Sequence, residues 1–140
     1  MKPITAEWVA KAEGDLTTAR RELAASESPN YDAACFHAQQ CAEKYLKGLL
    51  VEAGATFPKT HDLSALLDLV LPIEPGLSEL RGALDRLTDL GVEVRYPGVS
   101  AGEADATEAV RAAERVRGVI RSGMGLDTRP SGHEPTPDRA

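Results

Sequence analysis

The chain has 140 residues, a length typical of one domain, and 42% of them are hydrophobic, which is enough for a buried core. Only 4% are aromatic, so we expect a core built mainly from Ala, Leu and Val, as in closely packed helices. The formal net charge of -6 argues against a protein that coats nucleic acid non-specifically, because such binding needs an excess of Lys and Arg. This charge leaves room for a small local RNA site.

No apolar run approaches the length of about 18 residues that a membrane span needs. The first five residues carry no hydrophobic region of a signal peptide. We therefore expect a soluble cytoplasmic protein without a membrane segment.

The first predicted helix opens at Thr5 or Glu7 and runs to about Ala25. Its apolar stripe consists of Trp8, Ala12, Leu16, Ala19 and Leu23. Asp15 lies at the edge of this stripe, where its carboxylate needs a partner or water. Residues 26–30, with Pro and Asn, interrupt the helical pattern.

The second predicted helix runs from about Tyr31 to Ala53 and ends at Gly54. At about 100° per residue, its apolar residues fall on one broad face. The opposite side carries a polar stripe formed by His37, Gln40, Glu43, Lys44 and Lys47. The simpler interpretation of this stripe is a solvated face with ion pairs such as Glu43 with Lys47, and the alternative is a functional site.

Cys35 and Cys41 share the apolar face of this second helix. Six residues of helix place their Cα atoms about 9 Å apart, which is too far for a disulfide. We therefore interpret both as small buried residues. No Cys and His spacing in the chain suggests a metal site.

Thr60 is predicted to cap a short third helix, which carries Leu63 to Val70 and ends before Pro72. A fourth helix is expected from about Gly76 to Leu90, and residues 91–98 break the helical period. A fifth helix starts between residues 102 and 105 and runs to about residue 122. Its arginines are interpreted as solvated: Arg111, Arg115, Arg117 and Arg121.

Residues 123–140 contain Gly, Pro and charge without periodicity, and we predict a disordered tail there. Residues 1–122 are predicted to form an all-α, antiparallel up-and-down bundle of about five helices.

Besides Asp15 in the first helix, the candidate site residues outside the second helix are His61, Arg95 and Tyr96. His61 would satisfy the first turn of a helix or act in chemistry. Arg95 would pair with a nearby carboxylate such as Glu93, or bind a phosphate through its planar guanidinium. Tyr96 would pack at the core edge or stack on a base.

Several residues, in this order and spacing, are similar to one family pattern. They are Trp8, Ala12, Asp15, Leu16, Tyr31, Phe36, Ala38, Gln39, Gln40, Glu43, Lys44, Lys47, Leu50, Lys59, Thr60, His61, Asp62, Leu63, Leu66, Arg95, Tyr96 and Pro97. Together they resemble the HEPN domain family over roughly residues 5–121.

This resemblance implies a helical bundle that usually dimerises and is frequently paired with a minimal nucleotidyltransferase, often as a toxin-antitoxin module. We predict no cofactor and no metal for this chain. Many members of the family look like metal-independent ribonucleases with an Arg-x(4–6)-His motif. Here residues 96–102, which follow Arg95, contain no His, and Arg129 with His133 is one residue short of that spacing. His37 or His61 would supply the missing acid or base only if the fold brings one of them near Arg95.

The leading hypothesis is a homodimeric module that binds a nucleotide or RNA phosphate through Arg95. Tyr96 and the polar stripe residues Gln40, Glu43 and Lys47 would contribute, and Asp15 would position Lys47 or Arg95. One alternative is a divergent metal-independent ribonuclease that uses Arg95 with a relocated histidine. Another is an adaptor that holds a partner protein and binds no ligand.

Overall fold

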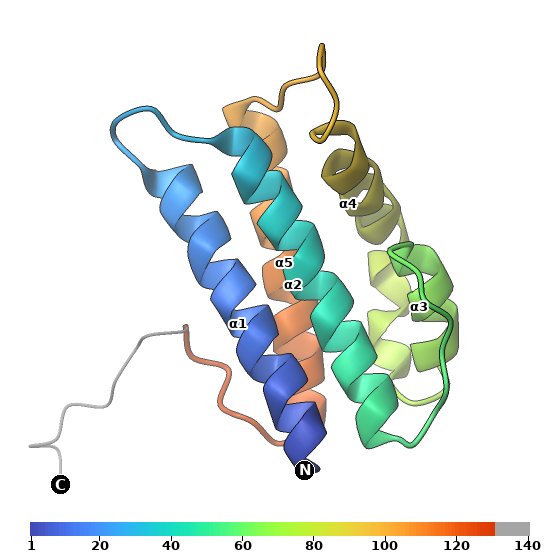
Figure 1. The fold of residues 1–140 in the computed structure, drawn as a ribbon. Helices are drawn as coiled ribbons and strands as arrows, with labels where there is room; N and C mark the ends of the chain where they lie inside the picture. Colours follow the sequence, from blue (N-terminus) through green and yellow to red (C-terminus); the bar gives the residue numbers. More distant parts are fainter. Residues whose placement is uncertain (131–140) are drawn as a thin grey trace, which may run out of the picture.

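The computed structural model describes residues 1–130, which form five α-helices and one 3₁₀ helix and contain no strand. In chain order these are α1 (Pro3–Ala24), α2 (Tyr31–Glu52), α3 (Leu63–Val70), the 3₁₀ helix η1 (Pro75–Leu80), α4 (Arg81–Glu93) and α5 (Glu103–Gly123). Figure 1 shows α1 and α4 running in one direction and α2 and α5 in the other. The predicted all-α bundle is confirmed. None of the helices within residues 1–130 is long and apolar enough to cross a membrane.

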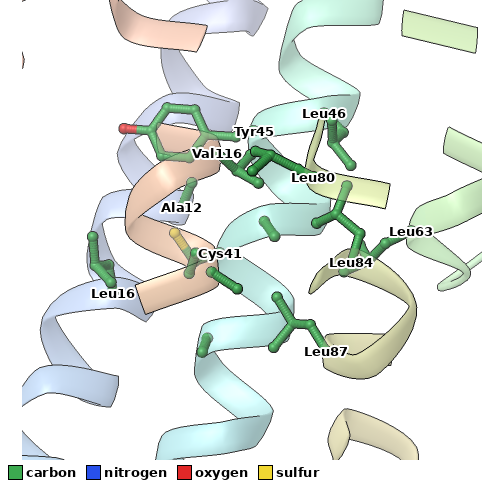
Figure 2. Close-up of a cluster of buried hydrophobic side chains, with 14 of the residues drawn as sticks. Ala12, Leu16, Cys41, Tyr45, Leu46, Leu63, Leu80, Leu84, Leu87 and Val116 are labelled. Atoms are coloured by element: carbon green, nitrogen blue, oxygen red, sulfur yellow. The ribbon is translucent and has the colours of Figure 1, made fainter. Parts of the chain in front are cut away.

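Helix α2 is the centre of the bundle, because it packs against α1, α3, α4 and α5. Its Tyr45, Leu46 and Leu50 are fully buried, and Figure 2 shows side chains from α1, α4 and α5 meeting it in the core. Cys35 and Cys41 are also fully buried, as predicted. Burial raises the pKa of the Cys35 thiol to about 11, so it stays protonated at neutral pH.

The ends of α2 and α3 test the predicted helix boundaries. Helix α2 stops at Glu52, and Gly54 follows in the left-handed region with a φ of 72°, where glycine is favoured. Thr60 is not the cap of α3. The helix begins at Leu63, so Asp62 stands at the N-cap position and its carboxylate accepts a hydrogen bond from the Ser64 N–H.

The segment predicted as one helix over residues 76–90 is divided differently. Residues 75–80 form the 3₁₀ helix, and α4 continues to Glu93. The prediction that the helical period breaks at Gly91 is wrong, because Gly91 lies inside α4. Glycine is required there because the position packs against Gln39 of α2, where a larger residue would not fit. A turn over residues 94–98 follows.

The first part of the predicted tail makes contacts with the bundle. Residues 124–130, which we name the C-terminal strap, follow α5, and Met124 and Leu126 pack against the core. Arg117 donates hydrogen bonds to the carbonyl oxygens of Thr128 and Arg129. The rest of the predicted tail, with His133, lies outside the described residues, and the division into a bundle and a tail stays a prediction.

Two glycines inside helices are expected to respond to alanine in opposite directions. A Cβ added at Gly14 in α1 meets nothing within 4 Å, whereas one at Gly91 lies 2.7 Å from Cγ and 2.8 Å from Cβ of Gln39. Gly14→Ala should raise the free energy of unfolding by about 0.5–1 kcal/mol, because alanine reduces the conformational entropy of the unfolded chain. Gly91→Ala should lower it by about 1–3 kcal/mol through overpacking. Urea denaturation of both variants measures the difference, and equal responses would contradict the close packing at Gly91.

Candidate functional site

The polar stripe of α2 is buried around Glu43. Glu43 is 4% exposed, and its carboxylate accepts hydrogen bonds from Lys47 Nζ at 2.9 Å and Gln39 Nε2 at 3.1 Å. Lys47 itself is only 8% exposed. The predicted ion pair between Glu43 and Lys47 is therefore confirmed, but its predicted solvation is wrong. The pair is covered because α4, at Gly91, and the segment before α3, at His61, both pack on this side of α2.

The electrostatics of this cluster favour an ionised carboxylate. Burial alone would raise the pKa of Glu43, yet the hydrogen bonds from Lys47, His61 and Gln39 hold the pKa below the ordinary value of a glutamate. Glu43 is therefore an anion at neutral pH, and it neutralises the buried ammonium group of Lys47.

His61 joins this cluster from the segment before α3. Its Nδ1 lies 2.9 Å from Oε1 of Glu43, and its side chain is 64% exposed. Because an ionised carboxylate only accepts hydrogen bonds, the Nδ1 atom donates, and Nε2 is left as the nitrogen that can exchange a proton with another group.

A second carboxylate and histidine pair lies between α1 and α2. Asp15 Oδ1 lies 2.8 Å from Nδ1 of His37, and Asp15 Oδ2 accepts from Lys44 Nζ at 2.5 Å. The predicted need of Asp15 for a partner is thus met. The partners differ from those in the prediction, since the structure places Lys44 and His37 beside Asp15 rather than Lys47 or Arg95.

Arg95 lies in the turn after α4, with its guanidinium carbon 5.0 Å from the centroid of the Phe36 ring. The Phe36 ring in turn meets the His37 ring edge-on, with centroids 5.3 Å apart. No carboxylate within residues 1–130 forms an ion pair with Arg95, so the interpretation that Arg95 pairs with Glu93 is wrong. Tyr96 is 62% exposed and does not pack at the core edge.

These residues lie on one side of α2, partly exposed and partly buried, and we name this side the α2 polar face. It consists of Phe36, His37, Gln40, Glu43, Lys44 and Lys47 of α2, with Asp15, His61 and Arg95 beside them. Gln40 is half-buried and donates to Gln39 Oε1 at 2.8 Å, so it belongs to the same network as Glu43. His37 and Glu43 are six residues apart, which separates the two histidine pairs by about 9 Å along the helix axis. The face thus combines two histidines that are held by carboxylates with one unpaired guanidinium.

The sequence pattern of the HEPN domain matches residues 5–122 of this chain. The chain belongs to the HEPN domain family. A search of curated proteins finds no match for this HEPN domain.

Two solved structures share the fold of this HEPN domain. The crystal structure of TT1696 from Thermus thermophilus is 27% identical, with a TM-score of 0.74, and the alignment covers 85% of this chain and 97% of that one. The crystal structure of ST0689, an archaeal HEPN homologue, is 30% identical, with a TM-score of 0.65, and the alignment covers 89% of this chain and 98% of that one.

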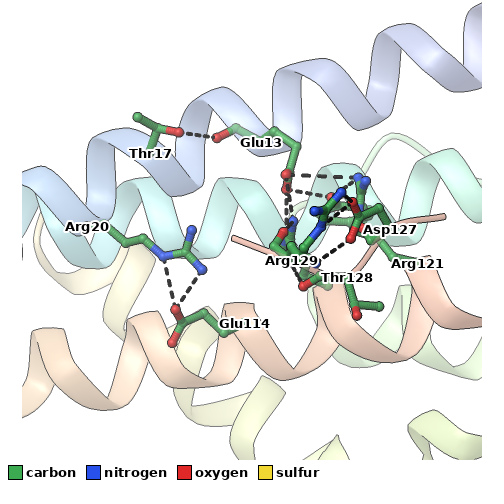
Figure 3. A network of polar contacts seen from close by, with 10 residues as sticks. Glu13, Thr17, Arg20, Glu114, Arg121, Asp127, Thr128 and Arg129 are labelled. Atoms are coloured by element: carbon green, nitrogen blue, oxygen red, sulfur yellow. Dashed lines mark hydrogen bonds and ion pairs between the residues drawn. The ribbon is translucent and has the colours of Figure 1, made fainter. Parts of the chain in front are cut away.

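The HEPN domain also contains a polar network that the sequence analysis missed (Figure 3). Arg117 is 4% exposed and donates to Glu13 from Nε at 2.8 Å and from Nη2 at 3.0 Å, and Tyr45 OH donates to Glu13 Oε2 at 2.6 Å. The interpretation of Arg117 as solvated is therefore wrong. The missed signal was its spacing, since it lies four residues after Ala113 and seven after Val110 and so shares their buried face.

In this second network the electrostatics favour an ionised Glu13 and a protonated Tyr45. Burial alone would raise the pKa of Glu13, but the hydrogen bonds from Arg117 and Tyr45 bring it below the ordinary value of a glutamate. Burial and the hydrogen bond to Glu13 raise the pKa of Tyr45, so its phenol stays a donor. The described residues of the HEPN domain contain no group of three or more His, Cys, Asp or Glu side chains that would hold a metal ion.

Proposed function

We propose that this HEPN domain binds a nucleotide or RNA phosphate at the α2 polar face, with Arg95 as the phosphate contact. The proposal rests on the surroundings of the Arg95 side chain. It is exposed, it rests on the Phe36 ring, and it has no carboxylate partner within residues 1–130. By contrast, the guanidinium groups of Arg20, Arg86 and Arg117 are occupied by carboxylates.

The geometry suits a phosphate for a simple reason. When the flat side of a guanidinium packs on an aromatic ring, its N–H groups point outward in the plane, where they can form paired hydrogen bonds to an oxyanion. Tyr96, exposed in the next position, supports the proposal, because a free aromatic ring can stack on a base. Gln40 offers a further amide close to the same end of α2. Binding would be local, since the net charge of the chain is -6.

The ribonuclease alternative is favoured by a different observation. His37 and His61 each have Nδ1 bonded to a carboxylate, which leaves Nε2 to take up or give a proton. In a cleavage without metal, one imidazole would accept the proton of the 2′-hydroxyl while that oxygen attacks phosphorus. The other imidazole would protonate the leaving 5′-oxygen, and the products would carry a 2′,3′-cyclic phosphate and a 5′-hydroxyl.

Binding of labelled single-stranded RNA, followed by fluorescence anisotropy, tests the proposal. Arg95→Ala should weaken binding about tenfold or more, because a hydrogen bond to a charged group contributes about 1.5–3 kcal/mol. Arg21→Ala is the matched control, since Arg21 is exposed on α1 and forms no ion pair within residues 1–130. Equal affinities for the parent and Arg95→Ala would refute the proposal.

The same protein, incubated with total RNA in EDTA, separates the alternatives. Cleavage that is lost in Arg95→Ala and in His61→Gln would establish the ribonuclease. The adaptor hypothesis predicts neither binding nor cleavage from a folded protein, tolerance of Arg95→Ala, and a stable complex with a minimal nucleotidyltransferase.

A further inference from the structure

A small pocket, which we name the α1 pocket, lies on the exposed side of α1. Its volume is about 200 Å³, and it is lined by Ile4, Glu7, Trp8 and Lys11, which follow one another at helical spacing. Ile4 is 49% exposed although it is a large apolar residue. Trp8, which the periodicity assigns to the apolar stripe of α1, is only partly buried. The pocket therefore presents apolar surface that residues 1–130 do not cover.

The polar groups of the α1 pocket have no partner within the described part of the chain. The carboxylate of Glu7 and the ammonium group of Lys11 are exposed and form no ion pair there. The indole N–H of Trp8 likewise donates to no acceptor within residues 1–130. The pocket thus combines an aromatic ring with a free acceptor, a free donor and a free positive charge.

The α1 pocket continues the α2 polar face along the bundle, in which α1 and α2 lie side by side (Figure 1). Trp8 packs against α2 at Gly48, where a Cβ built on the glycine would lie 3.1 Å from Cβ of Trp8. Lys11 lies three residues after Trp8 and four before Asp15, so these residues share one side of α1. Asp15 in turn holds Lys44 of the α2 polar face. A ligand that extends along this face therefore meets the pocket.

The distance along α2 sets the size of such a ligand. At one end of the α2 polar face Arg95 rests on Phe36, and at the other end Gly48 contacts the α1 pocket. Phe36 and Gly48 are twelve residues apart, which corresponds to about 18 Å along the helix axis. About five stacked nucleotides cover this distance, at about 3.4 Å per nucleotide of one strand. A single nucleotide with its phosphate at Arg95 does not reach the pocket.

We infer that the α1 pocket is a subsite for one base of a single-stranded oligonucleotide that has another of its phosphates at Arg95. The base stacks on the Trp8 ring, since every base has a flat face that an aromatic side chain accepts. Lys11 contacts the neighbouring backbone phosphate, and Glu7 accepts a hydrogen bond from the amino group of an adenine or cytosine. An apolar side chain of a partner protein would use neither of these charges. The length of the ligand rests on the proposed phosphate contact at Arg95.

The fluorescence of Trp8 tests the subsite directly, because Trp8 is the only tryptophan of the chain. Titration of the full chain with hexa-adenylate should quench the indole emission, since a base then stacks on the ring. Titration with AMP should leave the emission unchanged, since AMP bound at Arg95 is too short to reach the pocket.

Fluorescence anisotropy of labelled hexa-adenylate measures how much the pocket contributes to affinity. Trp8→Leu should weaken binding about fivefold to a hundredfold, the range for the loss of one stacked base, whereas Trp8→Phe keeps a ring and should retain most of the affinity. Lys11→Gln should lower the slope of log affinity against log salt by about one, as expected for one lost phosphate contact. Arg21→Gln is its matched control, because Arg21 is an exposed cation of α1 outside the pocket.

The outcomes distinguish this inference from the proposed function. Trp8 emission that hexa-adenylate does not change, or full affinity of Trp8→Leu and Lys11→Gln, would overturn the base subsite and indicate an apolar side chain of a partner protein as the occupant. Loss of affinity in Arg95→Ala alone would then still support the phosphate contact. Conversely, quenching and affinity that persist in Arg95→Ala would uphold the subsite and overturn the phosphate contact. Equal quenching by AMP would overturn the requirement for an oligonucleotide. Circular dichroism verifies the fold of Trp8→Leu, and Lys11→Gln, at an exposed residue, keeps the test valid if Trp8→Leu does not fold.

Discussion

Glu43→Ala is expected to lower the free energy of unfolding by about 3–5 kcal/mol, because it leaves the buried ammonium group of Lys47 without a carboxylate. It also removes the acceptor of the Gln39 amide and of the His61 ring. Urea denaturation at neutral pH, followed by circular dichroism, measures the change.

The control is a double-mutant cycle with Lys47→Met. Lys47→Met removes the charge and keeps much of the side-chain volume, so Glu43→Ala/Lys47→Met should be more stable than Glu43→Ala alone. Glu108→Ala breaks a pair with Arg86 whose side chains are 52% and 46% exposed, and it should cost no more than about 1 kcal/mol. Additive effects of the two changes at Glu43 and Lys47 would show that this pair does not act as a buried unit.

Glu13→Ala is expected to cost about 3 kcal/mol at neutral pH, because Arg117 is almost fully buried and Glu13 is its only carboxylate partner within residues 1–130. The carbonyl oxygens of Thr128 and Arg129 still accept from Arg117, so the loss should fall at the lower end of the range for a broken buried pair. Glu114→Ala is the matched control on the more accessible pair with Arg20, whose side chains are 39% and 29% exposed, and it should cost no more than about 1 kcal/mol.

The effect of Glu13→Ala should depend on pH in a defined direction. Folding lowers the pKa of Glu13 below its ordinary value of 4.5, so the carboxylate stabilises the folded state above that pH. This stabilisation is lost as the pH falls through the lower pKa of the folded state. The parent and Glu13→Ala should therefore become similar in free energy of unfolding at acid pH. A difference between them that does not change with pH would contradict the ion pair with Arg117.

The helices that sequence periodicity predicts best are those with long regular stripes. Helices α1, α2 and α5 have 22, 22 and 21 residues, or about six turns each, so a single misplaced polar residue does not change the interpretation. The boundary of α4 was missed because its last turn depends on Gly91, and the pattern of one helix cannot show that Gln39 of another packs on that glycine. The cap of α3 was misplaced by two residues because Thr60 and Asp62 are both good cap residues.

The sequence predicted which residues belong to the candidate site, but it did not predict which of them pair with one another. Helical spacing placed Gln40, Glu43 and Lys47 on one stripe, and the structure adds that this stripe is covered. Whether a polar stripe is solvated depends on what packs over it, and His61 arrives from 18 residues further along the chain. The same reasoning applies to Asp15, because the packing of α1 against α2 brings Lys44 within hydrogen-bond distance of it.

The C-terminal strap has a consequence for how its sequence can vary. Arg117 and Arg121 hold it by the main-chain oxygens of residues 127–129, and every residue type carries such an oxygen. The strap can therefore accumulate substitutions at these positions and keep its place. The two arginines that hold it have no such freedom, so mutational tolerance should be high at residues 127–129 and low at Arg117 and Arg121 of the helix beneath them.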